Sequence, residues 1–284
     1  MAGILYLCAT PIGNLEDISL RVLRTLREVD LIAAEDTRNS IKLLNHFEIK
    51  VPMTSYHEFN KIEKAHQLAE KMHSGKNIAL ITDAGTPGIS DPGEELVRIC
   101  AEEGIQVISL PGAAACITAL TVSALPARRF SFEAFLPRDK KERGIVLKEL
   151  QQETRTMILY EAPHHLVSTL EELYQALGNR KISVCRELTK KHEEVIRASL
   201  EDVLALYREK EPRGEYVLVI EGKSYADIEK EQKEAWMQMS VFEHVKYYED
   251  KGAGRKEAMK LAAKDRGVSK RDVYQELLEG EGKV

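Results

Sequence analysis

The first 110 residues alternate short apolar runs with segments whose apolar residues recur at helical spacing. This alternation predicts strands separated by helices, and the short loops between them favour a parallel sheet covered on both faces. The runs are almost continuously apolar, as is typical of strands buried on both sides. The expected strands are Gly3–Cys8, Val29–Ala34, Asn77–Thr82 and Gln106–Leu110, and the expected helices are Ile18–Arg27, Asn60–Ser74 and Pro92–Glu103.

The pattern changes near Ala124–Arg129, and a second set of strands and helices follows. These elements predict a second α/β domain whose strands run in mixed directions. The expected strands are Phe130–Phe135, Thr156–Tyr160, Lys181–Cys185, Glu194–Ala198 and Glu215–Glu221, and the expected helices are Val146–Gln152, His164–Leu177 and Glu201–Tyr207.

The predicted fold class is therefore α/β, with two domains and a small helical addition. Residues 224–239 are polar and show no strong periodicity, so they are interpreted as a linker. From Val241 onward the pattern is wholly helical. The predicted boundaries are 1–125 for the N-terminal α/β domain, 126–223 for the second, 224–239 for the linker and 240–284 for the helical domain.

Composition limits the classes of function. The net charge of −5 gives no general attraction to nucleic acid or membrane, so a polyanionic partner must bind a local patch. No apolar run reaches the roughly 20 residues of a membrane helix, and the first residues do not resemble a signal peptide. We therefore expect a cytoplasmic protein without membrane association. The four cysteines form no CxxC pair and are expected to be reduced core thiols, and no metal site is expected.

Three loops that follow expected strands are rich in glycine and proline. They are Ala9–Leu15, Asp83–Gly88 and Pro111–Ala115. Taken singly, the first could be a plain tight turn, and the third could reflect close packing of a helix on the sheet. Because parallel strands end at one edge of a sheet, the three loops are expected to converge there, where open α/β sheets bind ligands. Asp91, Pro92 and Glu94 are explained by a helix start alone.

A set of short motifs covers nearly the whole chain. These motifs are Thr10–Asp17, Ala33–Arg38, Ser55–Glu58, Asp83–Pro87, Ile89–Gly93, Tyr160–His164, Arg186–Lys190 and Gly214–Glu215. With these blocks the sequence resembles the ribosomal RNA small subunit methyltransferase I family, in the tetrapyrrole-methylase-like class.

The resemblance implies a deep cleft between two domains that binds S-adenosylmethionine as methyl donor, without a metal. It also implies 2′-O-methylation of one cytidine in the decoding centre of 16S ribosomal RNA in the small ribosomal subunit, by a homodimer. The cofactor-binding residues that it implies are Pro11, Asp83, Gly85, Ile89, Ser90, Ala114, Ala115, Tyr160, Leu188 and Gly214.

A ribose hydroxyl is a weak acid, so a base or a cation that stabilises the oxyanion is expected beside it. The matched blocks offer Glu161, Glu187 and Lys190 as catalytic candidates. Glu35 and Asp36 are further candidates. Each carboxylate could instead form a salt bridge or a helix cap, for example with Arg38, and the sequence does not choose among them.

Two basic segments are candidates for RNA binding. One is Arg138, Lys140, Lys141 and Arg143, although Asp139 and Glu142 are interleaved as at a solvated helix start. The other lies in the tail, where a helix over Arg255–Lys264, a break at Gly267 and a helix capped by Ser269 outline a helix-turn-helix. Its candidate contacts are Lys256, Lys260, Lys270 and Arg271. A helical cap or an oligomerisation element is the competing interpretation.

Two alternative functions are also compatible with the sequence. The first is a methyltransferase of the same fold that acts on a corrin or siroheme precursor, which would not need the basic tail. The second is a non-catalytic nucleic-acid-binding protein, which would leave the three glycine- and proline-rich loops unexplained.

Overall fold

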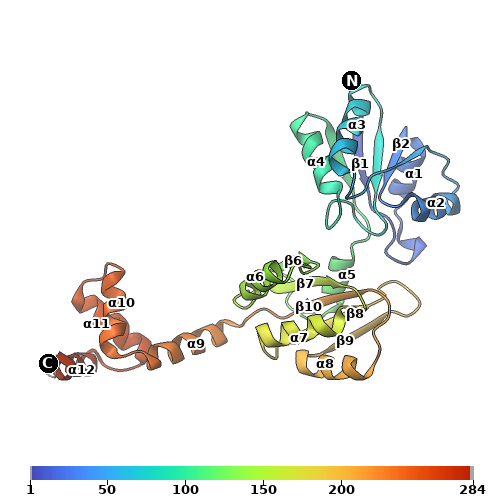
Figure 1. Cartoon of the computed structure of the whole chain (residues 1–284). Coiled ribbons are helices and arrows are strands. Elements are labelled where there is room, and N and C mark those ends of the chain that lie inside the picture. Colours follow the sequence, from blue (N-terminus) through green and yellow to red (C-terminus); the bar gives the residue numbers. More distant parts are fainter. Residues whose placement is uncertain (1, 282–284) are drawn as a thin grey trace. The chain divides into compact units, whose positions relative to one another are not determined.

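The computed structural model describes residues 2–281, which form two compact units (Figure 1). The first unit ends at Gly222 and the second begins at Lys223. The first unit contains two sheets with their helices, and the second unit consists of helices. No helix within residues 2–281 is long and apolar enough to cross a membrane.

The first sheet is entirely parallel, as the sequence predicts. Its strand order is β3-β2-β4-β1-β5, so β1 lies between β4 and β5. The strands are β1 (Ile4–Cys8), β2 (Leu31–Ala34), β3 (Met53–Ser55), β4 (Ile78–Ile81) and β5 (Gln106–Leu110). The helices that accompany them are α1 (Leu20–Glu28), α2 (Thr37–His46), α3 (Lys61–His73) and α4 (Gly93–Glu102), with a short 3₁₀ helix over Leu15–Asp17.

Helices cover both faces of this sheet. Alternate residues of a strand point to opposite sides, and here the residues on both sides are apolar and must be buried. Leu5 and Leu7 of β1 pack with α3 and α4, whereas Cys8 packs with α1 and α2. In β4, Ile78 and Leu80 share the first side, and Ala79 and Ile81 share the second. The predicted two-sided burial is confirmed, and it leaves the strand ends as the exposed edge of the sheet.

The second sheet has the order β6-β7-β10-β8-β9 and mixed strand directions. Only β6 and β7 are parallel to each other among its paired strands. Helices α6, α7 and α8 cover one face through a large apolar core. The strands are β6 (Phe130–Ala134), β7 (Thr156–Glu161), β8 (Lys181–Arg186), β9 (Glu194–Ser199) and β10 (Tyr216–Ile220), and the helices are α6 (Lys140–Leu150), α7 (Leu166–Leu177) and α8 (Leu200–Glu209).

Helix α5 (Ala115–Val122) covers the other face of the second sheet. Its residues Cys116, Ala119 and Leu120 pack against β7, β8 and β10. The boundary predicted at residue 125 assigns this helix to the first domain. In the structure the chain leaves the first sheet at β5 and enters the packing of the second sheet at once. The loop between β5 and α5 therefore lies where the two sheets meet.

The second unit contains α9 (Tyr225–Gln238), α10 (Val241–Asp250), α11 (Arg255–Arg266) and α12 (Lys270–Glu281). Its small core joins α10, α11 and α12. The linker expected over 224–239 is helical instead: Ser224 caps α9 by accepting from the backbone N–H of Asp227. None of the residues of α9 is buried, so the helix lacks the apolar periodicity that reveals helices in a sequence.

Candidate functional site

The loops after β1, β4 and β5 meet at one edge of the first sheet. Thr10 and Gly85 join the first two loops through backbone hydrogen bonds of 2.9 and 3.1 Å. The Thr86 hydroxyl donates to the carbonyl of Ala113, 2.9 Å away, and so joins the third loop to the second. The convergence that the sequence predicted is confirmed.

Two glycines permit this close approach of the loops. Gly85 has a φ of +84°, a backbone conformation that L side chains rarely adopt, and a Cβ there would lie 3.3 Å from Cγ2 of Ile12. A Cβ on Gly112 would lie only 2.5 Å from Cβ of Ala9. Larger residues at these positions would push the loops apart.

Asp91 folds the loop after β4. Its carboxylate accepts from the backbone N–H groups of Gly88 and Gly93, each at 2.8 Å, and of Ile89 at 3.3 Å. The helix begins at Gly93 with Pro92 as its N-cap, one residue later than the sequence suggested, and no side chain caps it. Asp91 therefore ties the loop to the first helical residue, Gly93.

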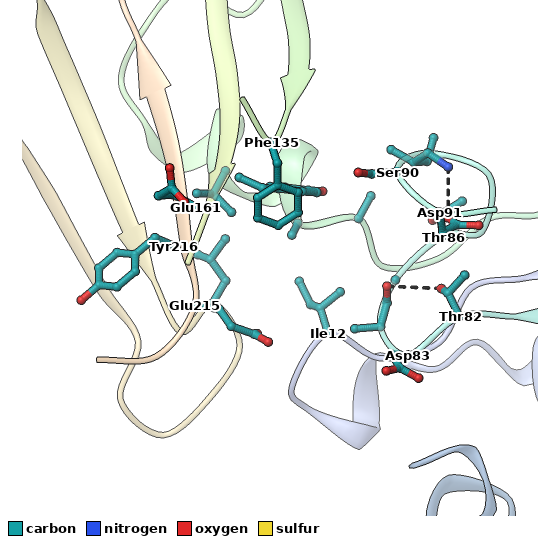
Figure 2. A pocket seen from close by; sticks show the side chains of 18 of the residues that line it. Ile12, Thr82, Asp83, Thr86, Ser90, Asp91, Phe135, Glu161, Glu215 and Tyr216 are labelled. Carbon is teal, nitrogen blue, oxygen red and sulfur yellow. Dashed lines mark hydrogen bonds between the residues drawn. The ribbon is translucent and has the colours of Figure 1, made fainter. Parts of the chain in front are cut away.

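The three loops form one wall of a cavity of about 540 Å³, the first cavity (Figure 2). The opposite wall comes from the second sheet, chiefly from the ends of β7, β8 and β10. The lining residues are Ile12, Glu35, Thr82, Asp83, Ala84, Gly85, Thr86, Ile89, Ser90, Asp91, Ala114, Ala115, Phe135, Tyr160, Glu161, Ala162, Pro163, Cys185, Leu188, Glu215, Tyr216 and Val217.

Tyr160 connects the second sheet to the start of α5. Its hydroxyl oxygen accepts from the backbone N–H of Cys116 at 3.2 Å. Phe132 and Phe135 contact its ring edge-on, with centroids 5.0 and 5.7 Å away. Burial raises the pKa of Tyr160, so the phenol remains neutral at physiological pH. Ala114, which precedes α5, provides no side-chain cap, so donors at this helix start remain available to a ligand.

Most of the residues proposed from the sequence to bind a cofactor lie around the first cavity. These are Asp83, Gly85, Ile89, Ser90, Ala114, Ala115, Tyr160 and Leu188. Pro11 and Gly214 are not part of its lining. Pro11 lines a neighbouring cavity, and Gly214 lies against Glu187, since a Cβ on Gly214 would be 2.6 Å from Cγ of that glutamate.

Glu161, a catalytic candidate, lines the first cavity but has its carboxylate occupied. One oxygen accepts from the backbone N–H of Ala162 at 2.8 Å, and the other accepts from the Thr169 hydroxyl. That hydroxyl in turn accepts from Arg143 at 2.8 Å. These bonds hold Glu161 in place and leave it poorly arranged to take a proton from a ligand.

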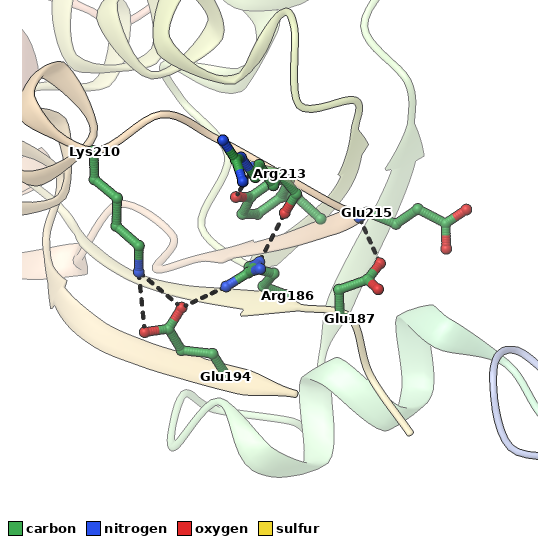
Figure 3. A network of polar contacts seen from close by, with 7 residues as sticks. Arg186, Glu187, Glu194, Lys210, Arg213 and Glu215 are labelled. Atoms are coloured by element: carbon green, nitrogen blue, oxygen red, sulfur yellow. Dashed lines mark hydrogen bonds and ion pairs between the residues drawn. The ribbon is translucent and has the colours of Figure 1, made fainter. Parts of the chain in front are cut away.

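Glu187 and Lys190, the other two candidates, lie outside the first cavity. Figure 3 shows Glu187 accepting from the backbone N–H of Glu215, at 2.9 Å. The Lys190 ammonium donates to Glu187 at 3.0 Å and to Glu215 at 2.7 Å. Burial alone would lower the pKa of Lys190, but the bonds to Glu215 and Glu187 outweigh it and raise the pKa. Lys190 is therefore a permanent cation rather than a base.

The backbone after β8 is unusual, since Glu187 and Thr189 have positive φ values of 51° and 66°. Residues other than glycine are seldom held in this conformation, and they cluster at functional sites. A backbone hydrogen bond from Glu187 to Glu215, 2.9 Å long, holds the turn in place. The turn brings Leu188 into the lining of the first cavity and Lys190 into the lining of an adjacent cavity.

This adjacent cavity, the second cavity, has a volume of about 450 Å³. It lies between α2 and the loops that follow β1, β4 and β8. Its lining residues are Thr10, Pro11, Ile12, Gly13, Leu15, Asn39, Lys42, Leu43, His46, Asp83, Ala84, Lys190 and Glu215.

The two carboxylates after β2 have different roles. Asp36 caps α2 by accepting from the backbone N–H of Arg38 and forms an ion pair of 2.7 Å with the same arginine, which lowers its pKa to about 2. Glu35 lines the first cavity instead. Burial raises the pKa of Glu35, and the nearby charges of Asp83 and Asp91 add to the rise.

The first basic segment is only partly available to a polyanion. Arg138, Lys140 and Lys141 are exposed at the start of α6. Arg143 is not, since its side chain is 17% exposed and pairs with Glu172 and Thr169. A sequence gives no sign of such partners, which come from another helix. Arg143, a candidate RNA contact, is therefore already engaged within the second sheet's helices.

The basic tail of the second unit has the predicted helical outline. Gly267 ends α11 in the left-handed conformation, and Ser269 and Asp272 cap the start of α12 reciprocally. Lys256, Lys260, Lys270 and Arg271 are all exposed. Lys260 pairs with Glu257 at 3.8 Å.

Several cavity residues were not singled out from the sequence. Phe135 lines the first cavity because a register shift in β6 and a positive φ at Ala134 turn the chain just before it. Glu215 borders both cavities. All four cysteines are buried free thiols, as predicted. Within residues 2–281, no group of three or more His, Cys, Asp or Glu side chains could hold a metal ion.

A parallel sheet joined to a mixed sheet, with a cavity where the two meet, defines a class of α/β proteins with two sheets. Residues 4–204 match the family model of the tetrapyrrole (corrin/porphyrin) methylases. Solved structures share the fold. Diphthine synthase is 15% identical with a TM-score of 0.62, over 77% of this chain and 90% of that one. Uroporphyrin-III C-methyltransferase from Thermus thermophilus, complexed with S-adenyl homocysteine, is 19% identical with a TM-score of 0.54, over 77% and 97%.

Closer relatives narrow the assignment. The protein named ribosomal RNA small subunit methyltransferase I from Halalkalibacterium halodurans is 50% identical to this chain, over 96% of this chain and 93% of the relative. The protein of that name from Escherichia coli O157:H7 is 44% identical, over 99% and 96%. The chain belongs to the ribosomal RNA small subunit methyltransferase I family, within the tetrapyrrole methylases.

Proposed function

We propose that this protein transfers a methyl group from S-adenosylmethionine to the 2′-hydroxyl of a cytidine in 16S ribosomal RNA of the small ribosomal subunit. The observation that carries the proposal is the first cavity, built by three converging loops at the edge of the parallel sheet. The names of the relatives support the RNA substrate.

The residues of the first cavity suit this donor. A volume of about 540 Å³ is typical of small-molecule sites. S-adenosylmethionine carries a sulfonium and an ammonium group, and the carboxylates of Glu35, Asp83 and Asp91 lie in the lining. Apolar Ile12, Ile89 and Leu188 offer surfaces for an adenine ring.

The start of α5 suits the carboxylate of the donor. Ala114 and Ala115 leave backbone N–H groups without a side-chain cap, and the positive end of the helix dipole lies there. Tyr160 holds this helix start through its bond to Cys116. We therefore assign Ala114 and Ala115 to the methionine end and the loop Asp83–Ser90 to the rest of the donor.

When bound, S-adenosylmethionine supplies an electrophilic methyl group for direct transfer to oxygen. The protein must hold the acceptor hydroxyl in line with that group, and such alignment can lower the barrier by about 7–11 kcal/mol. Asp83 borders both cavities and can accept the proton of the hydroxyl. Lys190, protonated between two carboxylates, can stabilise negative charge that develops on the acceptor oxygen.

The second unit supports binding of the large RNA substrate. Lys256, Lys264, Lys270 and Arg271 are exposed and form no ion pair or hydrogen bond within residues 2–281. Such cations neutralise phosphates and raise the local concentration of RNA. We also expect the protein to act as a homodimer in the cytoplasm; light scattering at working concentration would test the oligomeric state.

The proposal is tested by incubating the protein with purified small ribosomal subunits and labelled S-adenosylmethionine and then mapping the modified nucleoside. We expect one 2′-O-methylcytidine in 16S ribosomal RNA. Label on a base, or label only on a tetrapyrrole precursor supplied in parallel, would overturn the assigned substrate. Calorimetry without heat on addition of S-adenosylmethionine would reject the donor and favour a pure binding protein.

A further inference from the structure

The second cavity is not part of the proposed donor site, but the two cavities share a wall. Ile12, Asp83, Ala84 and Glu215 line both cavities. A group bound in the second cavity would therefore be separated from the first cavity only by these residues. In a direct transfer the acceptor must bind within reach of the donor, so a neighbouring cavity of this kind is the natural place for it.

Helix α2 forms the outer wall of the second cavity. Asn39, Lys42, Leu43 and His46 line it and are spaced as i, i+3, i+4 and i+7, so one face of the helix looks into the cavity. Leu44 on another face packs in the core of the first sheet. The helix therefore presents a mixed polar and apolar surface to the cavity while its buried side keeps it in place.

Of the charged side chains that line the second cavity, some are paired with other residues and others are not. Lys190 is held by Glu187 and Glu215 at 3.0 and 2.7 Å. Lys42 is exposed and forms no ion pair or hydrogen bond within the described part of the chain, residues 2–281. Asp83 accepts from the Asn39 amide at 3.4 Å, near the limit of a hydrogen bond. An anion would thus find one uncommitted lysine, and a hydroxyl or amino group would find weakly engaged acceptors.

The rest of the lining suits a nucleoside. Pro11, Ile12, Leu15 and Leu43 give apolar surfaces against which a base can lie. A volume of about 450 Å³ accommodates a ligand of nucleotide size. Enzymes that recognise single-stranded or looped RNA commonly take an unstacked nucleotide against apolar and polar side chains, and this lining offers both.

We propose that the second cavity holds the acceptor nucleotide, with Lys42 bound to a phosphate beside it and α2 as its outer wall. This inference rests on the proposed function and adds the place of the RNA. It commits to a nucleotide in an RNA strand rather than to the distal part of the methyl donor, which is the other ligand that could extend from the first cavity.

The matched pair Lys42→Ala and Lys50→Ala tests the proposal. Both remove one exposed lysine near α2, but Lys50 does not line either cavity. With small subunits as substrate, we expect Lys42→Ala to raise KM about tenfold, as for loss of one hydrogen bond to a charged group. The slope of log KM against log salt should fall by about 0.7, as for one lost phosphate contact. Lys50→Ala should behave like the wild type, and Lys42→Arg, which keeps the positive charge, should retain the salt dependence that Lys42→Ala loses.

A second variant fills the cavity. Leu43→Trp should lower kcat/KM for small subunits while S-adenosylmethionine binds as in the wild type, as measured by calorimetry, which also shows that the variant is folded. If Lys42→Ala matches Lys50→Ala, or if Leu43→Trp loses donor affinity and keeps KM for the subunit, the cavity does not hold the acceptor. A wild-type protein that leaves small subunits unmethylated would instead reject the proposed function itself.

Discussion

Asp83 is a carboxylate that borders both cavities, and its side chain has only a weak contact with Asn39 at 3.4 Å. Asp83→Asn removes the negative charge but keeps the shape. We expect kcat to fall by about 100-fold or more, as for loss of a general base, while the thermal unfolding midpoint stays at the wild-type value. Methylation of saturating small subunits under multiple-turnover conditions measures kcat, and near-normal turnover would exclude Asp83 from the reaction.

Glu35 is a carboxyl whose pKa is raised by burial and then by nearby acidic groups. A carboxyl with a higher pKa in the folded than in the unfolded state binds its proton more tightly when folded. Its contribution to stability is therefore unfavourable at neutral pH, and this cost is relieved as the pH falls through the folded-state pKa. We expect Glu35→Gln to raise the unfolding midpoint at neutral pH, with the gain disappearing in acid. A gain that is the same at every pH would contradict this explanation.

The sequence predicted residues well where local chemistry determines the role. Gly85 and Gly112 lie where two loops approach so closely that a larger side chain would not fit. Glycines in such loops can be recognised from the sequence alone. Phe135 and Arg143 depend on distant partners: the first on a register shift in β6, the second on Glu172 of α7. Nothing in a single sequence indicates such pairings.

At the scale of elements, Asp91 is the side chain that binds the second half of the loop after β4. Asp91→Ala removes the acceptors of three backbone N–H groups, the last of which belongs to Gly93 at the start of α4. Loss of these bonds should cost about 1–2 kcal/mol of unfolding free energy, and the loosened loop should bind S-adenosylmethionine several-fold more weakly. Ser269→Ala is a matched control, since it removes the cap of α12 in the second unit. It should leave calorimetric donor affinity unchanged; an equal loss in both variants would refute a specific role of Asp91.

The strands and long helices were predictable because burial of one or both faces makes apolar residues recur at regular spacing in their sequences. β1, β4 and β5 agree with their expected ranges within a residue or two. α2 and β3 were missed: β3 has only three residues, and α2 directs just two residues into full burial. α6 begins at Lys140, before its apolar residues, because Asp139 caps it by accepting from Lys141 and Glu142. The cap, rather than the apolar pattern, sets where that helix starts.

At the scale of the whole molecule, a net charge of −5 conceals an uneven distribution. The lining of the first cavity is acidic, with Glu35, Asp83 and Asp91 among its residues. The helices α11 and α12 expose lysine and arginine side chains. A cationic small molecule and a polyanionic RNA can thus be bound by different parts of one chain, which a total charge does not reveal.

Because the second unit has its own core, its removal tests this division directly. We expect deletion of residues 223–284 to weaken binding of small subunits and leave calorimetric affinity for S-adenosylmethionine unchanged. If Lys256, Lys264, Lys270 and Arg271 each contact a phosphate, the slope of log affinity against log salt should fall by about 3. The full-length protein with these four residues changed to alanine should show the same loss while its helices, followed by circular dichroism, persist. Equal loss of donor and subunit affinity on deletion would show that the second unit supports the fold rather than the RNA.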